Sequence, residues 1–308
     1  MGPERMIEPK SYAVICDAAS AVCGLPAVAT LDWCDGAASA LTHLASPALT
    51  GVLIGTLEAD GTLGQIEAAG VAGRAEAYPS AGAGFGSAHA AVELSTKDAR
   101  LTGLRARLER LGTLGWAVGP EVVRHGAAAP MSRLAGEGWR HTAAGKVWGD
   151  IEPETVLAGI RPIGTAEPGR AVIAMMAVPE TSPSKVEALS AMLGAVLGLV
   201  EKRAVMAIGS KRASSTQWLT GREQVVLEQL SLGKSVRQIA EELDRSPHTV
   251  HDHVKSLHRK LDASSRGELI ARALGHIQPA APTEGGNPEV VTTPGVGTKA
   301  TAIRSSDA

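Results

Sequence analysis

The stretch SPHTVHDHVKSLHRKL, residues 246–261, contains four histidines and carries apolar residues at helical spacing. Each residue of an α-helix turns by about 100°, so one narrow stripe along such a helix collects the apolar side chains Val250, Val254, Leu257 and Leu261. The opposite side collects His248, His251, Asp252, Lys255, His258 and Arg259. The pattern therefore predicts a helix that is buried along one edge and presents a polar, partly basic face to its surroundings.

A metal site is the first alternative to consider for so many histidines. His251 and His258 are seven residues apart, which is about 10 Å along a helix axis and too far for one ion. His248 and His251 are closer, but no cysteine stands nearby, and Asp252 alone does not complete a tetrahedral ligand set. We therefore predict no metal and no cofactor.

The neighbouring residues predict three further helices joined by short connections. Each of the four helices has a start signal with a capping hydroxyl, namely Thr220 with Glu223, Ser235 with Gln238, Ser246 with Pro247, and Ser265 with Glu268. Gly233 marks the end of the first helix. A short helix, a tight turn and a longer helix with an exposed polar face are typical of a helix-turn-helix, whose second helix enters the major groove of DNA.

The segment LTGREQVVLEQLSLGKSVRQIAEELDRSPHTVHDHVKSLHRKLDASSRGEL, residues 219–269, resembles the LuxR-type helix-turn-helix domain. The landmarks that match are Leu219, Thr220, Arg222, Glu223, Val226, Leu227, Gly233, Ile239, Ala240, Leu243, Ser246, Thr249, Val250, His253, Lys260, Leu261, Ser265 and Arg266. Region four of sigma factors shares the opening Leu-Thr-x-Arg-Glu, but His253 and the ending around Lys260 favour the LuxR type.

The resemblance implies a four-helix DNA-binding domain that dimerises through its last helix, where Leu269 and Leu274 are the candidate contacts. It implies base contacts from His251, Asp252 and Lys255, and phosphate contacts from Thr249, His253 and Lys260. Lys234, Ser246 and Arg259 complete the predicted set of DNA-binding residues. Relatives often carry Lys at the position of His251 and an apolar residue at that of Asp252, so the operator sequence is expected to differ from theirs.

Composition and patterning divide the chain into four parts. We predict an α/β (α+β) sensor domain over 1–181, a long helix and linker over 182–216, the all-α helix-turn-helix domain over 217–276, and a disordered tail over 277–308. Within the first part, hairpins are expected over 49–70 and 155–178, an exposed basic helix over 95–112 and a plain loop over 79–88. In the long helix, apolar residues at spacings of three and four from Val186 to Val200 form a seam. This seam could pack either against its own domain or against a helix of a partner.

The order of helix, hairpin, helices, hairpin and long helix is similar in layout to GAF and PAS sensor domains. The acidic residues Asp32 and Asp35 are not arranged as in a phosphorylation receiver. Trp33, Trp116, Trp139 and Trp148 are interpreted as core residues, although they could line a small pocket. Cys16, Cys23 and Cys34 are interpreted as small buried residues.

Charge and missing motifs narrow the function. The chain of 308 residues has a net charge of −2, no long apolar run and no apolar signal core at its start, so we expect a cytoplasmic protein with no membrane partner. No nucleophile elbow, Walker loop or zinc-protease motif is present, so we expect no enzyme. The expected partners are an inverted-repeat promoter operator in double-stranded DNA, a second copy of the chain, RNA polymerase and an unidentified small ligand. The alternative is a helix-turn-helix that contacts proteins, as a sigma-like factor or adaptor.

Overall fold

The computed structural model describes residues 9–76, 91–95, 97–164, 169–208, 218–274 and 276. The predicted loop over 79–88, the linker over 209–216 and the tail over 277–308 lie outside the described residues. Among the described residues, no helix is both long enough and apolar enough to cross a membrane.

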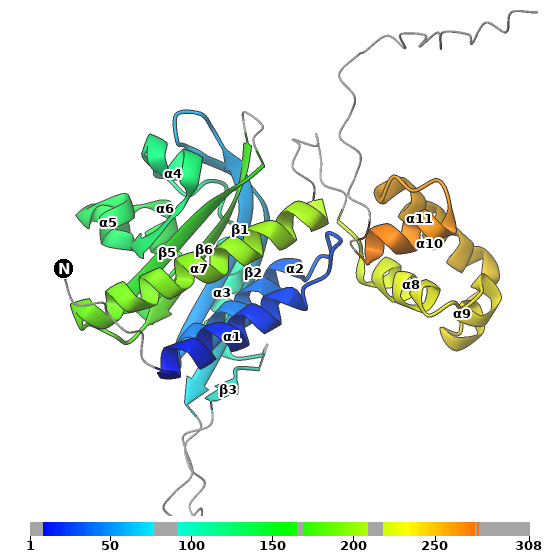
Figure 1. Cartoon of the computed structure of the whole chain (residues 1–308), viewed down its shortest axis with the longest axis horizontal. Coiled ribbons are helices and arrows are strands. Elements are labelled where there is room, and N and C mark those ends of the chain that lie inside the picture. Colours follow the sequence, from blue (N-terminus) through cyan, green and yellow to red (C-terminus); the bar gives the residue numbers. More distant parts are fainter. Residues whose placement is uncertain are drawn as a thin grey trace, which may run out of the picture.

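An antiparallel sheet of six strands in the order β3-β2-β1-β6-β5-β4 forms the centre of the N-terminal domain (Figure 1). Its strands are β1 (Ala48–Leu57), β2 (Leu63–Glu76), β3 (Ala91–Glu93), β4 (Ala127–Pro130), β5 (Thr155–Ile163) and β6 (Gly169–Val178). Both predicted hairpins are confirmed: β1 and β2 join through the turn at Asp60-Gly61, and β5 pairs with β6. Because β1 also pairs with β6, the two hairpins lie side by side in the middle of the sheet.

Helices cover both faces of this sheet. One face carries α1 (Pro9–Cys23), α2 (Trp33–Leu41) and α7 (Pro183–Ile208), and the other carries α3 (Ala99–Glu109), α4 (Pro120–His125), α5 (Met131–Ala135) and α6 (Ala143–Lys146). Side chains of β6 alternate between two apolar clusters, with Val172 and Ala174 in the first and Ile173 and Met175 in the second. The observed order of helices and hairpins agrees with the order predicted from the sequence, which is similar in layout to GAF and PAS domains.

Two expectations for the N-terminal domain need correction. The helix predicted over 95–112 is basic but not wholly exposed, because α3 buries Leu101, Leu104 and Leu108 against the sheet. Of the cysteines, Cys34 is buried, and this burial raises the pKa of its thiol, whereas Cys16 and Cys23 are exposed. All four tryptophans that we assigned to the core are buried: Trp33 in the first cluster, and Trp116, Trp139 and Trp148 in the second.

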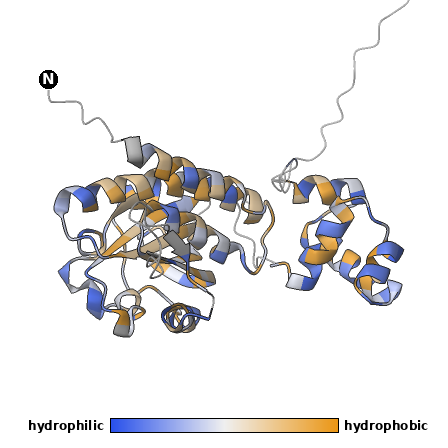
Figure 2. Ribbon diagram, turned by 90° about the horizontal axis from the view of Figure 1, so that it is seen from below, coloured by the Kyte–Doolittle hydropathy of each residue, from blue (hydrophilic) through white to orange (hydrophobic). Residues whose placement is uncertain are grey.

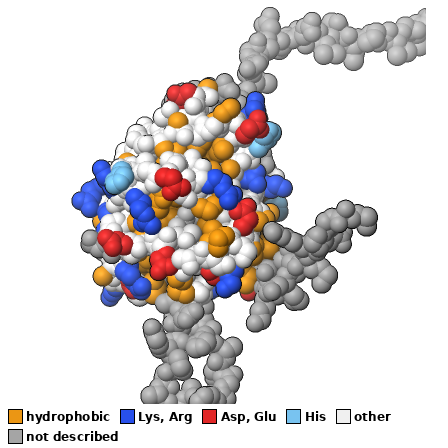
Figure 3. Space-filling view, turned by 90° about the vertical axis from the view of Figure 1, so that its left-hand side faces the viewer, with side chains coloured by type: hydrophobic (Ala, Val, Ile, Leu, Met, Phe, Trp, Pro, Cys, Tyr) orange, Lys and Arg blue, Asp and Glu red, His pale blue; other side chains and the backbone are white. Residues whose placement is uncertain are grey.

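Helix α7 packs its apolar seam onto its own domain. Val186, Leu193, Val196 and Val200 are all buried in the first cluster. The domain-core interpretation of this seam therefore holds for the described chain. Near its start, Glu187 of α7 pairs with Arg133 of α5 at 3.0 Å. The face of the molecule drawn in Figure 3 shows acidic and basic side chains interspersed with apolar areas.

Four helices make up the C-terminal domain, namely α8 (Gly221–Ser231), α9 (Val236–Glu242), α10 (Pro247–Lys260) and α11 (Arg266–Ala273). Each helix is hydrophobic on one side and hydrophilic on the other (Figure 2). The apolar sides meet in a third cluster that includes Val226, Leu230, Ile239, Val250 and Leu257. The predicted all-α helix-turn-helix fold is confirmed here, beside the α/β domain.

A short backbone pairing joins the two domains. The amide of Leu219 donates to the carbonyl of Ala29 at 2.7 Å, and the amide of Leu31 donates to the carbonyl of Leu219 at 3.2 Å. Val28, from the loop between α1 and α2, is buried in the cluster of the helix-turn-helix domain. The core of the C-terminal domain is thus completed by a residue of the N-terminal domain.

A close approach between helix α2 and strand β2 gives a test of this fold. A Cβ added at Gly70 of β2 would lie 2.2 Å from the amide nitrogen of Asp35 in α2. We expect Gly70→Ala to lower the free energy of unfolding by about 1–3 kcal/mol, because the backbone of α2 must shift. Urea unfolding measures this, with Gly112→Ala as the control because a Cβ there meets nothing within 4 Å. Equal midpoints for the two variants would contradict the packing of α2 on β2.

Candidate nucleic-acid interface

The ends of the helices are set by the residues that the sequence singled out. Thr220 and Glu223 form a complete capping box at the start of α8, and Ser235 and Gln238 form one at the start of α9. The hydroxyl of Ser246 accepts from the amide of Thr249 at 3.1 Å and caps α10. Ser265 likewise caps α11. Because these caps satisfy the amides that a helix leaves free at its start, all four helices begin where they were predicted to begin.

The turn between α9 and α10 is held by the backbone. Asp244 adopts a left-handed conformation with φ of 50°, which a short polar side chain tolerates better than most. The amide of Arg245 then donates to the carbonyl of Ala240 at 2.9 Å, closing the end of α9 in the manner of a Schellman motif. This tight turn fixes the direction in which α10 leaves α9.

Helix α10 is buried on one edge and exposed on the other, as predicted. Val250 and Leu257 are 1% and 0% exposed, and Val254 and Leu261 pack partly buried against the same cluster. On the other side, the exposed residues are His248, Thr249, His251, Asp252, Lys255 and Arg259. Six predicted DNA-binding residues therefore lie on the surface at or beside this face: Ser246, Thr249, His251, Asp252, Lys255 and Arg259.

Few contacts within the protein restrain the side chains of this face. Asp252 lies 3.6 Å from the ring of His248 one turn earlier, and Arg259 donates weakly to the hydroxyl of Ser256 at 3.4 Å. Within the described parts of the chain, the side chains of His251 and Lys255 have no hydrogen bond or ion pair. A cation and a histidine are thus presented without a protein partner.

Three basic side chains are placed differently from what the sequence suggested. Lys260 turns inward, where its ammonium donates to Glu223 at 2.7 Å and to the carbonyl of Trp218 at 2.8 Å. The Nδ1 atom of His258 lies 2.7 Å from the carbonyl of Ala263, which keeps this ring beside the end of α10. Lys234 pairs with Glu242 at 2.6 Å. The phosphate contact implied for Lys260 stays a prediction, and in this structure the side chain is engaged by the buried carboxylate of Glu223.

Glu223 is the centre of a buried polar network. Its carboxylate accepts from Lys260, from Ser256 at 2.7 Å, and from the amide and hydroxyl of Thr220 at 2.8 and 3.0 Å. Burial alone would raise the pKa of this carboxyl, but the hydrogen bonds from Lys260, Ser256 and Thr220 outweigh burial and lower the pKa to about 2. The network ties the start of α8 to the last two turns of α10.

The last helix presents one of its two predicted dimer contacts. Leu269 is 0% exposed and belongs to the core of its own domain, whereas Leu274 is 57% exposed. The hydroxyl of Ser265 caps α11, but Glu268 accepts from the amide of Ser264 rather than from that of Ser265. Leu269 is thus unavailable to a partner because it is enclosed, and Leu274 is the exposed candidate.

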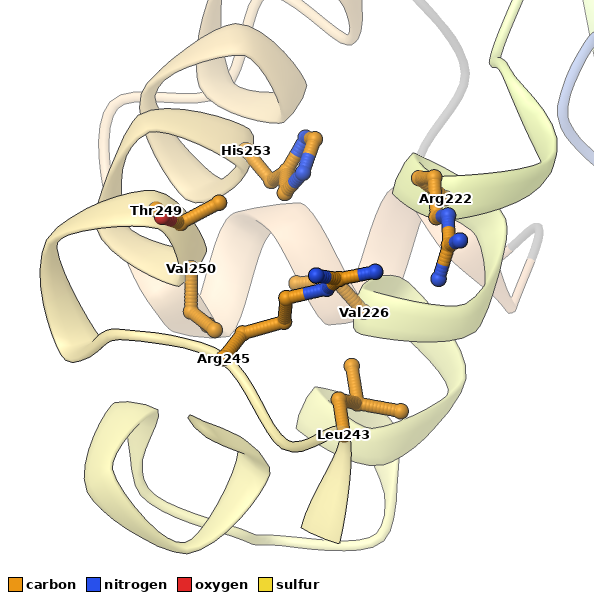
Figure 4. Close-up of a pocket in the computed structure, with 7 residues that line it drawn as sticks. All are labelled: Arg222, Val226, Leu243, Arg245, Thr249, Val250 and His253. Atoms are coloured by element: carbon orange, nitrogen blue, oxygen red, sulfur yellow. The ribbon is translucent and has the colours of Figure 1, made fainter. Parts of the chain in front are cut away.

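Two arginines near α10 were not among the predicted DNA-binding residues. Arg222 of α8 and Arg245 of the α9–α10 turn line a pocket of about 250 Å³ together with Val226, Leu243, Thr249, Val250 and His253 (Figure 4). In the sequence, Arg222 is only one landmark of the family resemblance, and Arg245 lies in the short connection just before Ser246. Neither lies on the helix whose wheel we examined, so only the packing of α8 against α10 brings them beside His253.

The buried network gives a test at this site. We expect Glu223→Gln to lower the free energy of unfolding near pH 7 by about 3 kcal/mol, because Lys260 loses its counter-charge inside the domain. Since the pKa of Glu223 falls from 4.5 in the unfolded chain to about 2 when folded, its stabilisation is present above pH 4.5 and is lost as the pH falls toward 2. The gap between wild type and variant should therefore narrow in that range.

Urea unfolding at several pH values measures this gap. Glu228→Gln is the control, because Glu228 lies on the same helix and is exposed. A gap that stays constant from pH 7 to pH 3 would contradict the role of the Glu223 charge.

Comparison with known proteins agrees with this geometry. Residues 217–273 match the family described as bacterial regulatory proteins, luxR family. The transcriptional regulatory protein UhpA of Escherichia coli is 47% identical over 66 residues, which are 21% of this chain and 34% of that protein. The probable transcriptional regulatory protein NarL of Mycobacterium tuberculosis is 34% identical over 83 residues, which are 27% of this chain and 35% of that protein. The chain thus spans about a third of the length of these curated relatives.

Among solved structures, Escherichia coli SdiA is 11% identical in sequence, and the alignment covers 74% of this chain and 82% of SdiA, with a TM-score of 0.22. The identification rests instead on the match over 217–273, on the complete capping boxes of α8 and α9 and on the tight turn between α9 and α10. Residues 217–273 of this chain are a LuxR-family helix-turn-helix domain.

Proposed function

We propose that this protein is a sequence-specific, DNA-binding transcriptional regulator in which α10 reads the major groove. The observation that carries the proposal is the exposed polar face of α10 within a LuxR-family domain. A single α-helix fits the major groove, and the stripe from Val250 to Leu257 fixes this helix to the domain core on its other side. A protein of this kind would act in the cytoplasm, where its promoter is.

The exposed side chains suggest how bases would be distinguished. Lys255 can donate to the O6 and N7 atoms of guanine, and the carboxylate of Asp252 can accept from the amino group of cytosine. His251 lies one turn before Lys255 on the same side of the helix, nearer its start. Ser246 and Thr249 present hydroxyl groups at that start, where a DNA phosphate would meet the positive end of the helix dipole.

The N-terminal part, 1–181, is proposed as a sensory or dimerisation domain, with 182–216 as the connection to the DNA-binding part over 217–276. In support of a ligand site, a cleft of about 360 Å³ is lined by residues that include Asp32, Ser39, Glu93 and Arg105. A homodimer would place two recognition helices about 34–36 Å apart on an inverted-repeat operator. RNA polymerase is the further partner of such a regulator.

DNA binding is tested by selecting bound fragments from randomised duplex DNA with the full chain. We expect a preferred sequence and an affinity that falls steeply with salt, since each neutralised phosphate contributes about −0.9 to the logarithmic slope. Binding that is indifferent to salt would instead favour the alternative in which the helix-turn-helix contacts proteins.

Lys255→Ala is the sharpest single change on the recognition face. We expect it to weaken binding to the selected duplex by roughly tenfold or more, and to relax the preference at one base pair, because its partner is a base edge. Fluorescence anisotropy measures both effects. Lys185→Ala is the matched control, because Lys185 is also an exposed lysine but stands near the start of α7. Unchanged affinity in Lys255→Ala would contradict the proposal that α10 reads the bases of the major groove.

The dimer contact is tested by placing a charge in the exposed surface of α11. We expect Leu274→Asp to shift the protein toward a monomer in analytical ultracentrifugation, because an apolar contact between two copies would then bury a carboxylate. Leu232→Asp is the control, because Leu232 is 70% exposed in the same domain but follows α8. A dimer that persists in Leu274→Asp would place the contact elsewhere, with the N-terminal domain as the next candidate.

A further inference from the structure

We propose that the pocket between α8 and α10 is a binding site for one phosphate of the DNA backbone, with Arg222, Arg245 and His253 as its donors. This inference rests on the proposed DNA-binding function and extends it to residues outside the exposed face of α10.

Three separate segments bring positive or donating groups to this pocket. Arg222 comes from the first turn of α8, Arg245 from the turn before α10, and His253 from the second turn of α10. In Figure 4, the side chains of Arg222 and Arg245 extend toward one another and the ring of His253 faces the space between the helices. Thr249 adds a hydroxyl at the rim, and it also contacts Ser246 at 2.9 Å.

The charges of this pocket are not balanced by the protein. Its lining contains two arginines and a histidine and no carboxylate. Within the described part of the chain, the guanidinium groups of Arg222 and Arg245 make no hydrogen bond or ion pair, and neither does the ring of His253. Glu223, the neighbour of Arg222, is turned away and is engaged by Lys260 and Ser256. Two like charges that face one another repel, so an anion between them would relieve the repulsion.

The donor set fits a phosphate. Guanidinium groups are planar forks that pair with two oxygens of a phosphate at once, which an ammonium group cannot do. The remaining walls, formed by Val226, Leu243 and Val250, are apolar and offer an anion no competing donor or acceptor side chain. Both arginines are exposed, so a phosphate on an outside partner can reach them. The pocket is small, at about 250 Å³, which suits a single group on a chain rather than a whole base.

The position beside α10 favours the DNA backbone as the source. His253 lies on the flank of the helix, about 60° from the buried Val250 on a wheel of 100° per residue. When the exposed face of a helix points to the floor of the major groove, its flanks face the phosphate strands that form the groove walls. A phosphate bound here would fix the rotation of α10 about its own axis, and therefore which side chains reach the bases.

The experiment compares salt dependence rather than affinity alone. Full-length wild type, Arg245→Ala, Arg222→Ala and the double variant are titrated against the selected duplex and a scrambled duplex over a range of salt concentrations. We expect each single variant to weaken binding roughly tenfold on both duplexes, and to reduce the magnitude of the logarithmic salt slope by about 1. Arg245→Lys should keep the slope, because it keeps the charge, while losing part of the affinity.

Arg124→Ala is the matched control, because it removes an exposed arginine from α4 of the N-terminal domain. Circular dichroism and urea midpoints confirm that each variant is folded. Wild-type affinity and slope in the double variant would overturn the phosphate site while leaving the proposed function intact. A loss confined to the selected duplex would also overturn it, because that result indicates base reading. Failure of wild type to bind any duplex would overturn the proposed function, and the phosphate site with it.

Discussion

The geometry of the DNA-binding part depends on one buried carboxylate. Glu223 caps α8 with Thr220 and receives the ammonium of Lys260 from the far end of α10. One side chain therefore decides both where α8 begins and how α10 crosses it. The exposed face of α10 and the pocket beside it are two consequences of that single crossing. Within the domain, the charge of Lys260 is balanced by this carboxylate.

Local signals in the sequence carried a large part of the prediction. Capping hydroxyls at Ser235 and Ser246 and the apolar stripe from Val250 to Leu257 act over a few residues, so they can be read without knowing the fold. The hairpin at Asp60-Gly61 is of the same kind. Contacts between distant residues could not be read in this way. Lys260 and Glu223 are 37 residues apart, and no pattern in the neighbouring sequence predicts that they are in contact.

The two arginines of the pocket are a second case in which local sequence signals do not predict a contact between distant residues. Arg245 lies in the turn before α10, where its amide closes the end of α9. Its side chain becomes part of a candidate site only because the fold brings Arg222 of α8 to the same pocket. Cys16 and Cys23 were assigned to the core by residue type alone, and α1 leaves them exposed because its buried stripe passes through Ala18 and Val22 instead. The type of a residue predicts burial less well than its place on a helix.

The loop between α1 and α2 makes the two domains chemically dependent on each other. Val28 occupies the interior of the helix-turn-helix domain, and the strand-like pairing at Leu219 carries its neighbours with it. A fragment that starts at residue 217 would lose this apolar plug and leave Leu219 uncovered, at a cost of about 1–2 kcal/mol for the lost valine alone. The free energy of unfolding of the helix-turn-helix domain therefore includes a contribution from the N-terminal half of the chain, so a displacement of that loop changes the stability of the DNA-binding part.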